Sequence, residues 1–469
     1  MDNLNSFSAS TELSGADFGD KRLNVRLEKL ASFLSARPGE SFPEATGSVA
    51  ALEATYRFLG NPKVTPEKIL ATHIEATINR ASFERRVIVA HDTTELVFPG
   101  EEPREGLGWV NGETQGFLAH FSLVLSRSEL VRPLGVLCME PIFRIEKPKS
   151  STLDRGKKTY SDKESYRWWN SVHKTEYLLP ESAKPIHVMD READDYELFS
   201  NLSNNNIRFV IRIRHNRAHC KAIGSIEEKK LFDFLAGGEV ICERDVSISK
   251  KARNKFGRDR KGDQPRGART AKLHMKAATI EMGRPNYAHK DLPSSLTVNC
   301  IHVYEVDAPE GTEPVDWKLI TQEPIKNAED ILNIIDDYRA RWTIEEYFKA
   351  LKTGCAYEKR QLESKESLLN ALAVFTPIAW QLLILKTLNR NHSELSAEYA
   401  LTKTQIDVLR AVSKKDIPEK PTINQALLAI AALGGHIPNN GLPGWQVLGR
   451  GMDTLLKMEI AWTARGERM

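Results

Sequence analysis

The sequence predicts a mixed α/β protein with helical segments at both ends of the chain. Three observations lead to this class. Leucines recur at helical spacing near the N-terminus, short β-branched and aromatic runs follow from about residue 86, and apolar helical stretches fill the C-terminal part. With 469 residues the chain is too long for one ordinary core, so we expect several domains.

The N-terminal segment, residues 1–65, is predicted to be a small helical DNA-binding domain. Leucines form one face of "GDKRLNVRLEKLASFL", while Arg22, Arg26 and Lys29 cluster on another. A lone helix of this kind is most simply explained by a solvated basic face. A second helical stretch, "SVAALEATYRFLGNP", follows, and a pair of short helices with a basic face is suited to DNA contact. The stretch "NPKVTP" then marks the boundary.

Residues 66–372 are predicted to form a mixed α/β domain. Its first half contains short runs of β-branched and aromatic residues between turn residues or helical stretches, as expected of neighbouring strands. These runs are "RRVIVAHDTTELVF", "GFLAHFSLVLS", "VRPLGVLCMEPIFR", "PIHVMDREADDYELF" and "IRFVIRIRHNR".

A basic β insertion is predicted within this domain, over residues 217–316. Its basic run, residues 250–276, contains eleven Lys and Arg against two Asp. Such a run is usually a solvated loop. Strand-like flanks such as "GEVICERDVSI" and "SSLTVNCIHVYEV" indicate instead a basic extension of a sheet, which is a plausible nucleic-acid surface.

Residues 373–469 are predicted to form an all-helical C-terminal domain. The stretch "LLNALAVFTPIAWQLLILKTL" is nearly long enough to span a bilayer, but it contains Asn370, Thr376, Pro377 and Gln381. We therefore interpret it as a buried helix or a kinked helical pair and expect no membrane partner.

Charge and cysteine content limit the partner and the compartment. The net charge is only +3, with 66 Lys and Arg against 63 Asp and Glu, so overall charge identifies no partner. The 5 cysteines are widely spaced without a C-x-x-C pair, and no secretory signal is visible. These features favour a reduced cytoplasmic protein.

A helix predicted over residues 336–354 carries an unusual polar stripe. At about 100° per residue, Tyr338, Arg341, Glu345 and Lys352 fall within roughly 60° of one another. Apolar side chains on the adjoining face would hold the stripe against a core. A carboxylate among groups that bind phosphates indicates phosphoryl chemistry on a polyanion.

Two further acids are expected to join Glu345. Asp92 closes "VIVAHD" and Asp190 closes "IHVMD", so both are predicted at strand ends, where they would face one crevice if the strands are neighbours. Three hard oxygen ligands suit Mg²⁺ or Mn²⁺. Either aspartate alone is more simply a helix cap or a turn former.

The Tyr-x-x-Arg-x-x-x-Glu-x-x-x-x-x-x-Lys spacing resembles the hallmark of the DDE cut-and-paste transposases of insertion-sequence family four. "HDTTELVF", "DREAD", "RFVIR", "RWTIEEYFKALKTG" and "LGGH" with a later "GW" are also similar to that family, in order along most of the chain. The resemblance implies an RNase H-like mixed-sheet core in which Asp92, Asp190 and Glu345 bind two Mg²⁺ ions, with Mn²⁺ able to substitute.

The resemblance also implies partners and a reaction. An N-terminal domain would read double-stranded transposon ends, and a helical C-terminal domain would form the homodimer of the synaptic complex. Hydrolysis frees a 3′-hydroxyl, which attacks the opposite strand to form a hairpin; the hairpin is reopened and the end joins target DNA. The implied location is the bacterial cytoplasm, on the nucleoid when DNA is bound.

Individual DNA contacts follow from the same resemblance. Tyr338, Arg341 and Lys352 would hold end phosphates beside Glu345, and Arg212 in "FVIRIR" matches an arginine that contacts DNA. Trp317 in "PVDWKLITQEP" matches a tryptophan that stacks on a flipped base. Without the resemblance, Trp317 would be interpreted as a core aromatic residue on a strand.

Two alternative functions remain open from the sequence. One is a catalytically silent DNA-binding regulator derived from a transposase, against which the three intact acids argue. The other is a metal-dependent nuclease or phosphohydrolase with other substrates. The basic N-terminal helices and the basic run disfavour it, because a small phosphorylated substrate needs neither.

Overall fold

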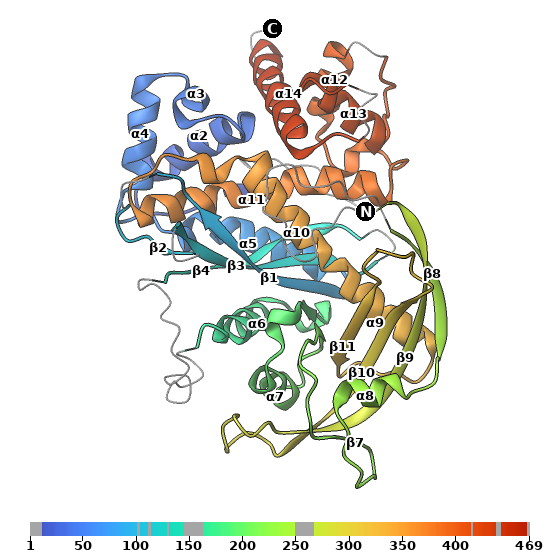
Figure 1. Cartoon of the computed structure of the whole chain (residues 1–469). Helices are drawn as coiled ribbons and strands as arrows, with labels where there is room; N and C mark the ends of the chain where they lie inside the picture. The colour runs from blue at the N-terminus through green and yellow to red at the C-terminus, as the bar shows by residue number, and fades with distance from the viewer. Residues whose placement is uncertain are drawn as a thin grey trace. The chain divides into compact units, whose positions relative to one another are not determined.

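The structure is a computed structural model of the chain (Figure 1). It describes residues 12–100, 104–110, 114–128, 131–144, 163–248, 267–413, 416–437 and 442–466. The chain divides into two compact units, and each is described by itself. Unit 1 comprises Met1–Thr152, Ser171–Pro185 and Ala340–Met469, and unit 2 comprises Leu153–Asn170 and Ile186–Arg339.

Unit 1 begins with short helices that are capped by side chains. The hydroxyl or carboxylate oxygens of Asp20, Ser41, Ser48 and Thr65 each accept a backbone N–H in the first turn of the following helix. The predicted leucine face of the first helix is largely confirmed: three of its four leucines are at most 1% exposed and Leu23 is half-buried. The helices are α2 (Lys21–Ala36), α3 (Phe42–Thr46), α4 (Val49–Leu59) and α5 (Pro66–Ser82).

Antiparallel strands form the sheet of unit 1, and helices α5, α10 and α11 pack against it. The prediction that Asp92 ends a strand is wrong. Asp92 lies within its strand, opposite Phe121, because the β-branched pair Thr93 and Thr94 continues the ladder as far as Val97. The strands are β1 (Val87–Val97), β2 (Gly108–Trp109), β3 (Gln115–Ser126) and β4 (Pro133–Ile142).

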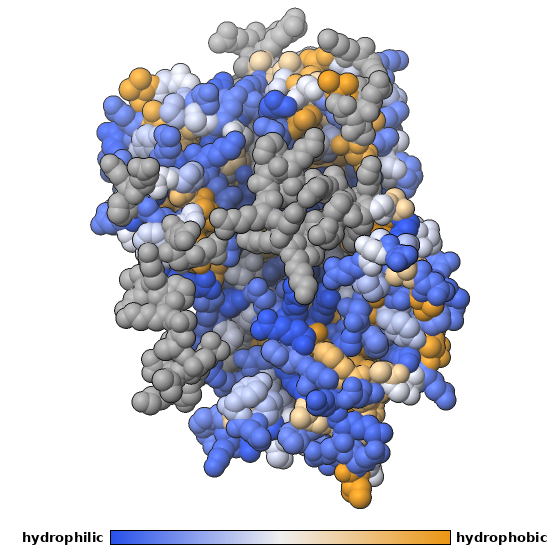
Figure 2. Space-filling view, in the orientation of Figure 1, coloured by the Kyte–Doolittle hydropathy of each residue, from blue (hydrophilic) through white to orange (hydrophobic). Residues whose placement is uncertain are grey.

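The long apolar stretch of the C-terminal part is a buried helix, α11 (Lys365–Asn391), with Pro377 inside it. By length and composition it could cross a membrane, but 94% of its most apolar window is buried within the protein. The described surface that faces the viewer is mainly hydrophilic (Figure 2). The predicted domain boundary near residue 372 falls inside this helix.

The helices that follow α11 agree with the sequence prediction of a helical C-terminal part. They are the 3₁₀ turn η7 (Ala397–Tyr399), α12 (Lys403–Val412), α13 (Ile423–Leu433) and α14 (Trp445–Gly466). Helix α14 packs on α13 and on α2, so a helix of the C-terminal part contacts one of the N-terminal helices within unit 1.

Unit 2 contains a mixed sheet in the order β5-β6-β11-β10-β9-β7, with β8 paired to β9. Strands β5 and β6 are parallel, and the pairs among the later strands are antiparallel. The strands are β5 (Ile186–Met189), β6 (Phe209–Arg212), β7 (Cys220–Ala222), β8 (Cys242–Ile248), β9 (Arg269–Gly283), β10 (Ser295–Val306) and β11 (Asp316–Thr321). The helices are α7 (Tyr196–Asn204), α8 (Leu231–Ala236) and α9 (Ala328–Ala340), with the 3₁₀ turn η4 (Arg191–Ala193). Helix α6 (Tyr166–Leu178) runs from unit 2 into unit 1, where the 3₁₀ turn η3 (Glu181–Ala183) follows.

Part of the predicted basic run belongs to β9. Arg269 forms an ion pair with Glu305 at 2.8 Å, and Lys272 forms one with Glu243 at 2.8 Å. Lys276 donates to the carbonyl of Ala236 at 2.6 Å. The remaining basic residues lie outside the described residues: Lys250, Lys251, Arg253, Lys255, Arg258, Arg260, Lys261 and Arg266.

The continuous helix predicted over residues 336–354 is wrong. Helix α9 ends at Ala340, α10 (Trp342–Lys349) begins after Arg341, and the π-helical turn η5 (Ala350–Gly354) follows, then the 3₁₀ turn η6 (Tyr357–Lys359). The break coincides with the boundary between the two units. A π turn holds more residues than an α turn, so it changes the direction of Lys352. The predicted apolar face is confirmed, because Ile344, Phe348 and Leu351 are buried.

Candidate active site

Arg341 joins two of the three predicted acids in unit 1. Its Nη1 donates to Asp92 Oδ2 at 2.9 Å, and its Nη2 donates to Glu345 Oε1 at 2.7 Å. Asp92 comes from β1, and Glu345 lies in the first turn of α10, which packs against β1. The i,i+4 spacing places Arg341 and Glu345 on one side of the chain. Residues far apart in the sequence therefore converge on one guanidinium.

The three side chains differ in exposure. The Arg341 side chain is 7% exposed and that of Asp92 16%, whereas that of Glu345 is 39% exposed. Asp92 Oδ1 also accepts the backbone N–H of Thr93 at 2.8 Å, which fixes the orientation of its carboxylate. The cluster thus has two carboxylates around a single arginine, and one edge of it reaches solvent.

This donor set has the chemistry that a hard divalent cation requires. Asp92 and Glu345 present oxygens to the same positive group, and carboxylate oxygens are the ligands that Mg²⁺ prefers. Across the described ranges, no group of three or more His, Cys, Asp or Glu side chains is placed to hold a metal ion. Unit 1 by itself supplies two of the predicted ligands.

The third predicted acid, Asp190, belongs to unit 2. It follows the last residue of β5, as predicted from the sequence, and it is partly exposed. Its Oδ1 accepts the backbone N–H of Glu192 at 2.8 Å, so it also caps the short turn η4. Asp190 is therefore a cap, as the simpler interpretation of a strand-terminal aspartate predicts. A cap can also serve as a metal ligand, so this contact leaves that role open.

Lys352 lies against the same strand as Asp92. Its Nζ donates to the backbone carbonyl of Glu95 in β1 and lies 3.8 Å from Glu358 Oε1. Burial lowers the pKa of Lys352, while the carboxylates of Glu358 and Glu95 partly offset this effect. Strand β1 therefore positions both Asp92 and Lys352.

The structure brings three other predicted DNA contacts into one region of unit 2. The rings of Trp317 and Tyr338 meet edge to face, with centroids 5.6 Å apart. Arg212 Nη2 donates to the carbonyl of Asp316, the neighbour of Trp317, at 3.1 Å. Trp317 is half-buried, whereas Tyr338 is only 1% exposed. Tyr338 thus packs in the core of unit 2, although the sequence predicted it on a polar stripe with Arg341, Glu345 and Lys352.

The predicted basic face of α2 is partly exposed. Arg22 and Lys29 are exposed and Arg26 is half-buried. Arg22 forms an ion pair at 2.9 Å with Asp20, and its hydrogen bonds lower the pKa of that carboxyl to about 2. These side chains are accessible to a phosphate backbone.

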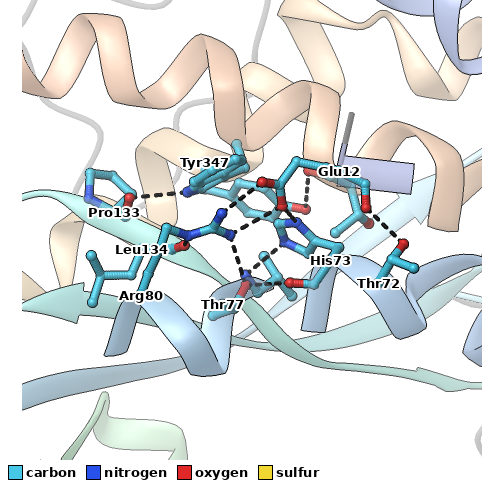
Figure 3. Close-up of polar contacts among 11 residues, drawn as sticks. Glu12, Thr72, His73, Thr77, Arg80, Pro133, Leu134 and Tyr347 are labelled. Carbon is cyan, nitrogen blue, oxygen red and sulfur yellow. Dashed lines mark hydrogen bonds and ion pairs between the residues drawn. The ribbon is translucent and has the colours of Figure 1, made fainter. Parts of the chain in front are cut away.

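A second charged cluster in unit 1 was not predicted. Glu12 accepts hydrogen bonds from His73 Nδ1 at 2.6 Å and from Arg80 Nη1 at 2.6 Å, while Arg80 Nε donates to the carbonyl of Leu134 at 2.6 Å (Figure 3). The backbone N–H of Val136 donates to His73 Nε2 at 3.1 Å, so the ring proton is on Nδ1. The sequence offered no signal for this cluster, because Glu12 is separated from both partners by most of the N-terminal helices.

Comparison with known families adds to this geometry. Residues 7–64 match a family model described as transposase DNA-binding, and residues 170–375 match one described as transposase DDE domain. The second match includes Asp190 and Glu345, while Asp92 lies ahead of it. By these two matches the chain is similar to DDE transposases, and the match to a DNA-binding domain lies ahead of the match to a DDE domain.

Proposed function

We propose that this protein is a DNA transposase of the cut-and-paste type, with an RNase H-like core in which Asp92, Asp190 and Glu345 form the catalytic triad. The observation that carries the proposal is the convergence of Asp92 and Glu345 on Arg341. Asp92 and Glu345 come from distant segments and meet at a partly exposed position, where their oxygens can serve as ligands of a divalent cation.

The residues have separate roles in this proposal. Asp92, Asp190 and Glu345 would hold two Mg²⁺ ions, for which Mn²⁺ can substitute, and such ions activate the attacking oxygen and stabilise the leaving one when bound. Lys352 adds a positive charge beside β1 that suits a phosphate group. Because each step is an in-line displacement at phosphorus, one set of carboxylates serves all of them.

The proposed reaction proceeds on the DNA in four steps. Hydrolysis at the transposon end frees a 3′-hydroxyl, which attacks the opposite strand to form a hairpin. The hairpin is then reopened, and the 3′ end is joined to target DNA. Trp317 would stack on a base that leaves the duplex, since an indole offers a planar face to any base.

DNA and a second copy of the chain are the proposed partners. The exposed Arg22 and Lys29 with Arg26 would contact the backbone of the transposon end, while Arg212 and Tyr338 would lie near the reacting strand. The C-terminal helices would form the homodimer that pairs two ends. The proposed location is the bacterial cytoplasm, on the nucleoid when DNA is bound.

A substitution at Asp190 tests the proposal. Asn can still cap η4, so Asp190→Asn removes the charge and keeps the local hydrogen bond. We expect this variant to bind DNA from the inverted repeats beside its gene and to lose nicking with Mg²⁺, measured on labelled duplexes.

Asp195→Asn is the matched control. Asp195 caps α7 in the same way, through the backbone N–H of Glu197 at 2.9 Å, and has no proposed metal role. Nicking should persist in this control. Unchanged nicking by Asp190→Asn would exclude the proposed triad, and DNA binding without nicking by the wild type would favour a silent regulator.

A further inference from the structure

Arg341 binds Asp92 and Glu345 at the same time, through two nitrogens of its guanidinium. Asp92 Oδ2 and Glu345 Oε1 are the oxygens that accept from Arg341, at 2.9 and 2.7 Å. A guanidinium remains charged at every physiological pH, so the pair is held by a permanent positive group. With its side chain 7% exposed, Arg341 is also shielded from the water that would weaken these contacts.

A divalent ion and Arg341 would compete for the same two carboxylates. An ion bound by both carboxylates would lie close to the guanidinium, and two positive groups this near repel each other strongly at a site of low exposure. Arg341 must therefore release at least one carboxylate before both can serve as ligands. An anionic acceptor suits the displaced guanidinium, because a negative group stabilises a positive charge at a position of low exposure.

A DNA phosphate has the required chemistry. Arginine binds phosphate through two parallel N–H donors, as it binds a carboxylate. Glu345 is the more exposed of the two partners, at 39%, so a phosphate can approach Arg341 from that edge. When Arg341 turns to the phosphate, the phosphate balances its positive charge, and Asp92 and Glu345 become free to bind a metal ion.

We propose that Arg341 is a gate on the metal site: it holds Asp92 and Glu345 together while no DNA is bound, and a DNA phosphate withdraws it so that the carboxylates can bind divalent ions. This inference rests on the proposed transposase function. Arg341 is a positioning residue here, acting on the ligands rather than on the reacting atoms. Its consequence is that metal loading depends on DNA.

The test is Mn²⁺ binding to the DNA-free protein, measured by electron paramagnetic resonance of the unbound ion. The wild type should bind Mn²⁺ weakly. Arg341→Gln, which cannot compete by charge, should bind it about tenfold more tightly. Arg339→Gln is the matched control, because Arg339 pairs with Asp336 at 3.1 Å and its removal changes the net charge equally. The Mn²⁺ affinity of this control should stay within about twofold of wild type.

If Arg341→Gln does not fold, Mn²⁺ binding is measured on Arg341→Lys instead. A lysine retains the charge but has one ammonium group instead of a two-pronged donor, so its Mn²⁺ affinity should lie between those of wild type and Arg341→Gln. Affinity at or below the wild-type value in the variants that fold would overturn the gate. If the wild type still nicks DNA with Mn²⁺, only the gate fails. If no variant binds Mn²⁺ and the wild type does not nick, the proposed function fails as well.

Discussion

Two clusters of charged side chains in unit 1 each contain an arginine but differ in the number of carboxylates. The Glu12 cluster has one carboxylate between two basic side chains, and the Arg341 cluster has one arginine between two carboxylates. At Glu12, one carboxylate accepts hydrogen bonds from both His73 and Arg80, and the Glu12 side chain is only 5% exposed. At Arg341, one guanidinium is shared by two carboxylates, and the Glu345 side chain is 39% exposed. Both clusters connect segments that are distant in the sequence.

The difference separates a structural role from a functional one. The Glu12 carboxylate is surrounded by donors, so its charge is balanced within the protein and a further cation would gain little there. At Arg341 one guanidinium donates to two carboxylates, and the Glu345 side chain at one edge of the cluster is accessible. Charge balance and exposure together, rather than the presence of an ion pair, indicate where an external cation can bind.

Removing Glu12 should have the largest effect on stability. Glu12→Ala would leave the buried His73 and the half-buried Arg80 without their shared carboxylate, at a cost of about 3–5 kcal/mol in the free energy of unfolding. Urea denaturation measures this change. The control is Glu40→Ala, because Glu40 is a partly exposed carboxylate that lies 3.3 Å from Lys457 and should contribute below about 1 kcal/mol. Equal losses in the two variants would remove the contrast.

The same cluster should make stability depend on pH. Burial lowers the pKa of His73 from its usual 6.5, despite the opposing effect of Glu12. Burial raises the pKa of Glu12, but hydrogen bonds and charge from His73 and Arg80 outweigh burial and leave it below 4.5. Both groups bind protons more readily in the unfolded chain.

The free energy of unfolding should therefore fall as pH decreases below 6.5 through the folded pKa of His73. It should fall again below 4.5 through that of Glu12, with each group contributing at most about 1.4 kcal/mol per pH unit. Urea titrations of wild type and Glu12→Gln from neutral to acid pH measure this. A variant that follows the wild-type curve below pH 4.5 would contradict the role assigned to Glu12.

Removing the charge of Glu345 should have the smallest effect on stability. Glu345→Gln leaves Arg341 with Asp92 as a charged partner, so we expect a change below about 1 kcal/mol in the free energy of unfolding. Cleavage of end DNA with Mg²⁺ should nevertheless fall to background. Calorimetry and a nicking assay on one preparation test both expectations, and a large loss of stability with retained cleavage would reverse the assignment.

Much of the local structure could be predicted because its signals are local. The leucine spacing predicted α2, and the β-branched runs predicted β1, β3, β4 and β10. The apolar stretch that contains Pro377 was predicted to be a buried helix or a kinked helical pair, and it forms the one helix α11. The prediction that Asp92 ends its strand failed because pairing with β3 extended the ladder beyond it. The break at Arg341 was missed because no glycine or proline marks the place where the chain passes from one unit to the other.

The sequence by itself determined the identity and order of the acids, the spacing of Tyr338, Arg341, Glu345 and Lys352, and the alternation of helices and strands, since each follows from side-chain chemistry and periodicity. Only the tertiary structure decided which of these residues meet. It placed Tyr338 in a core beside Trp317 and Arg341 between two carboxylates. Contacts between distant segments depend on how sheets and helices pack, and no local pattern encodes that packing.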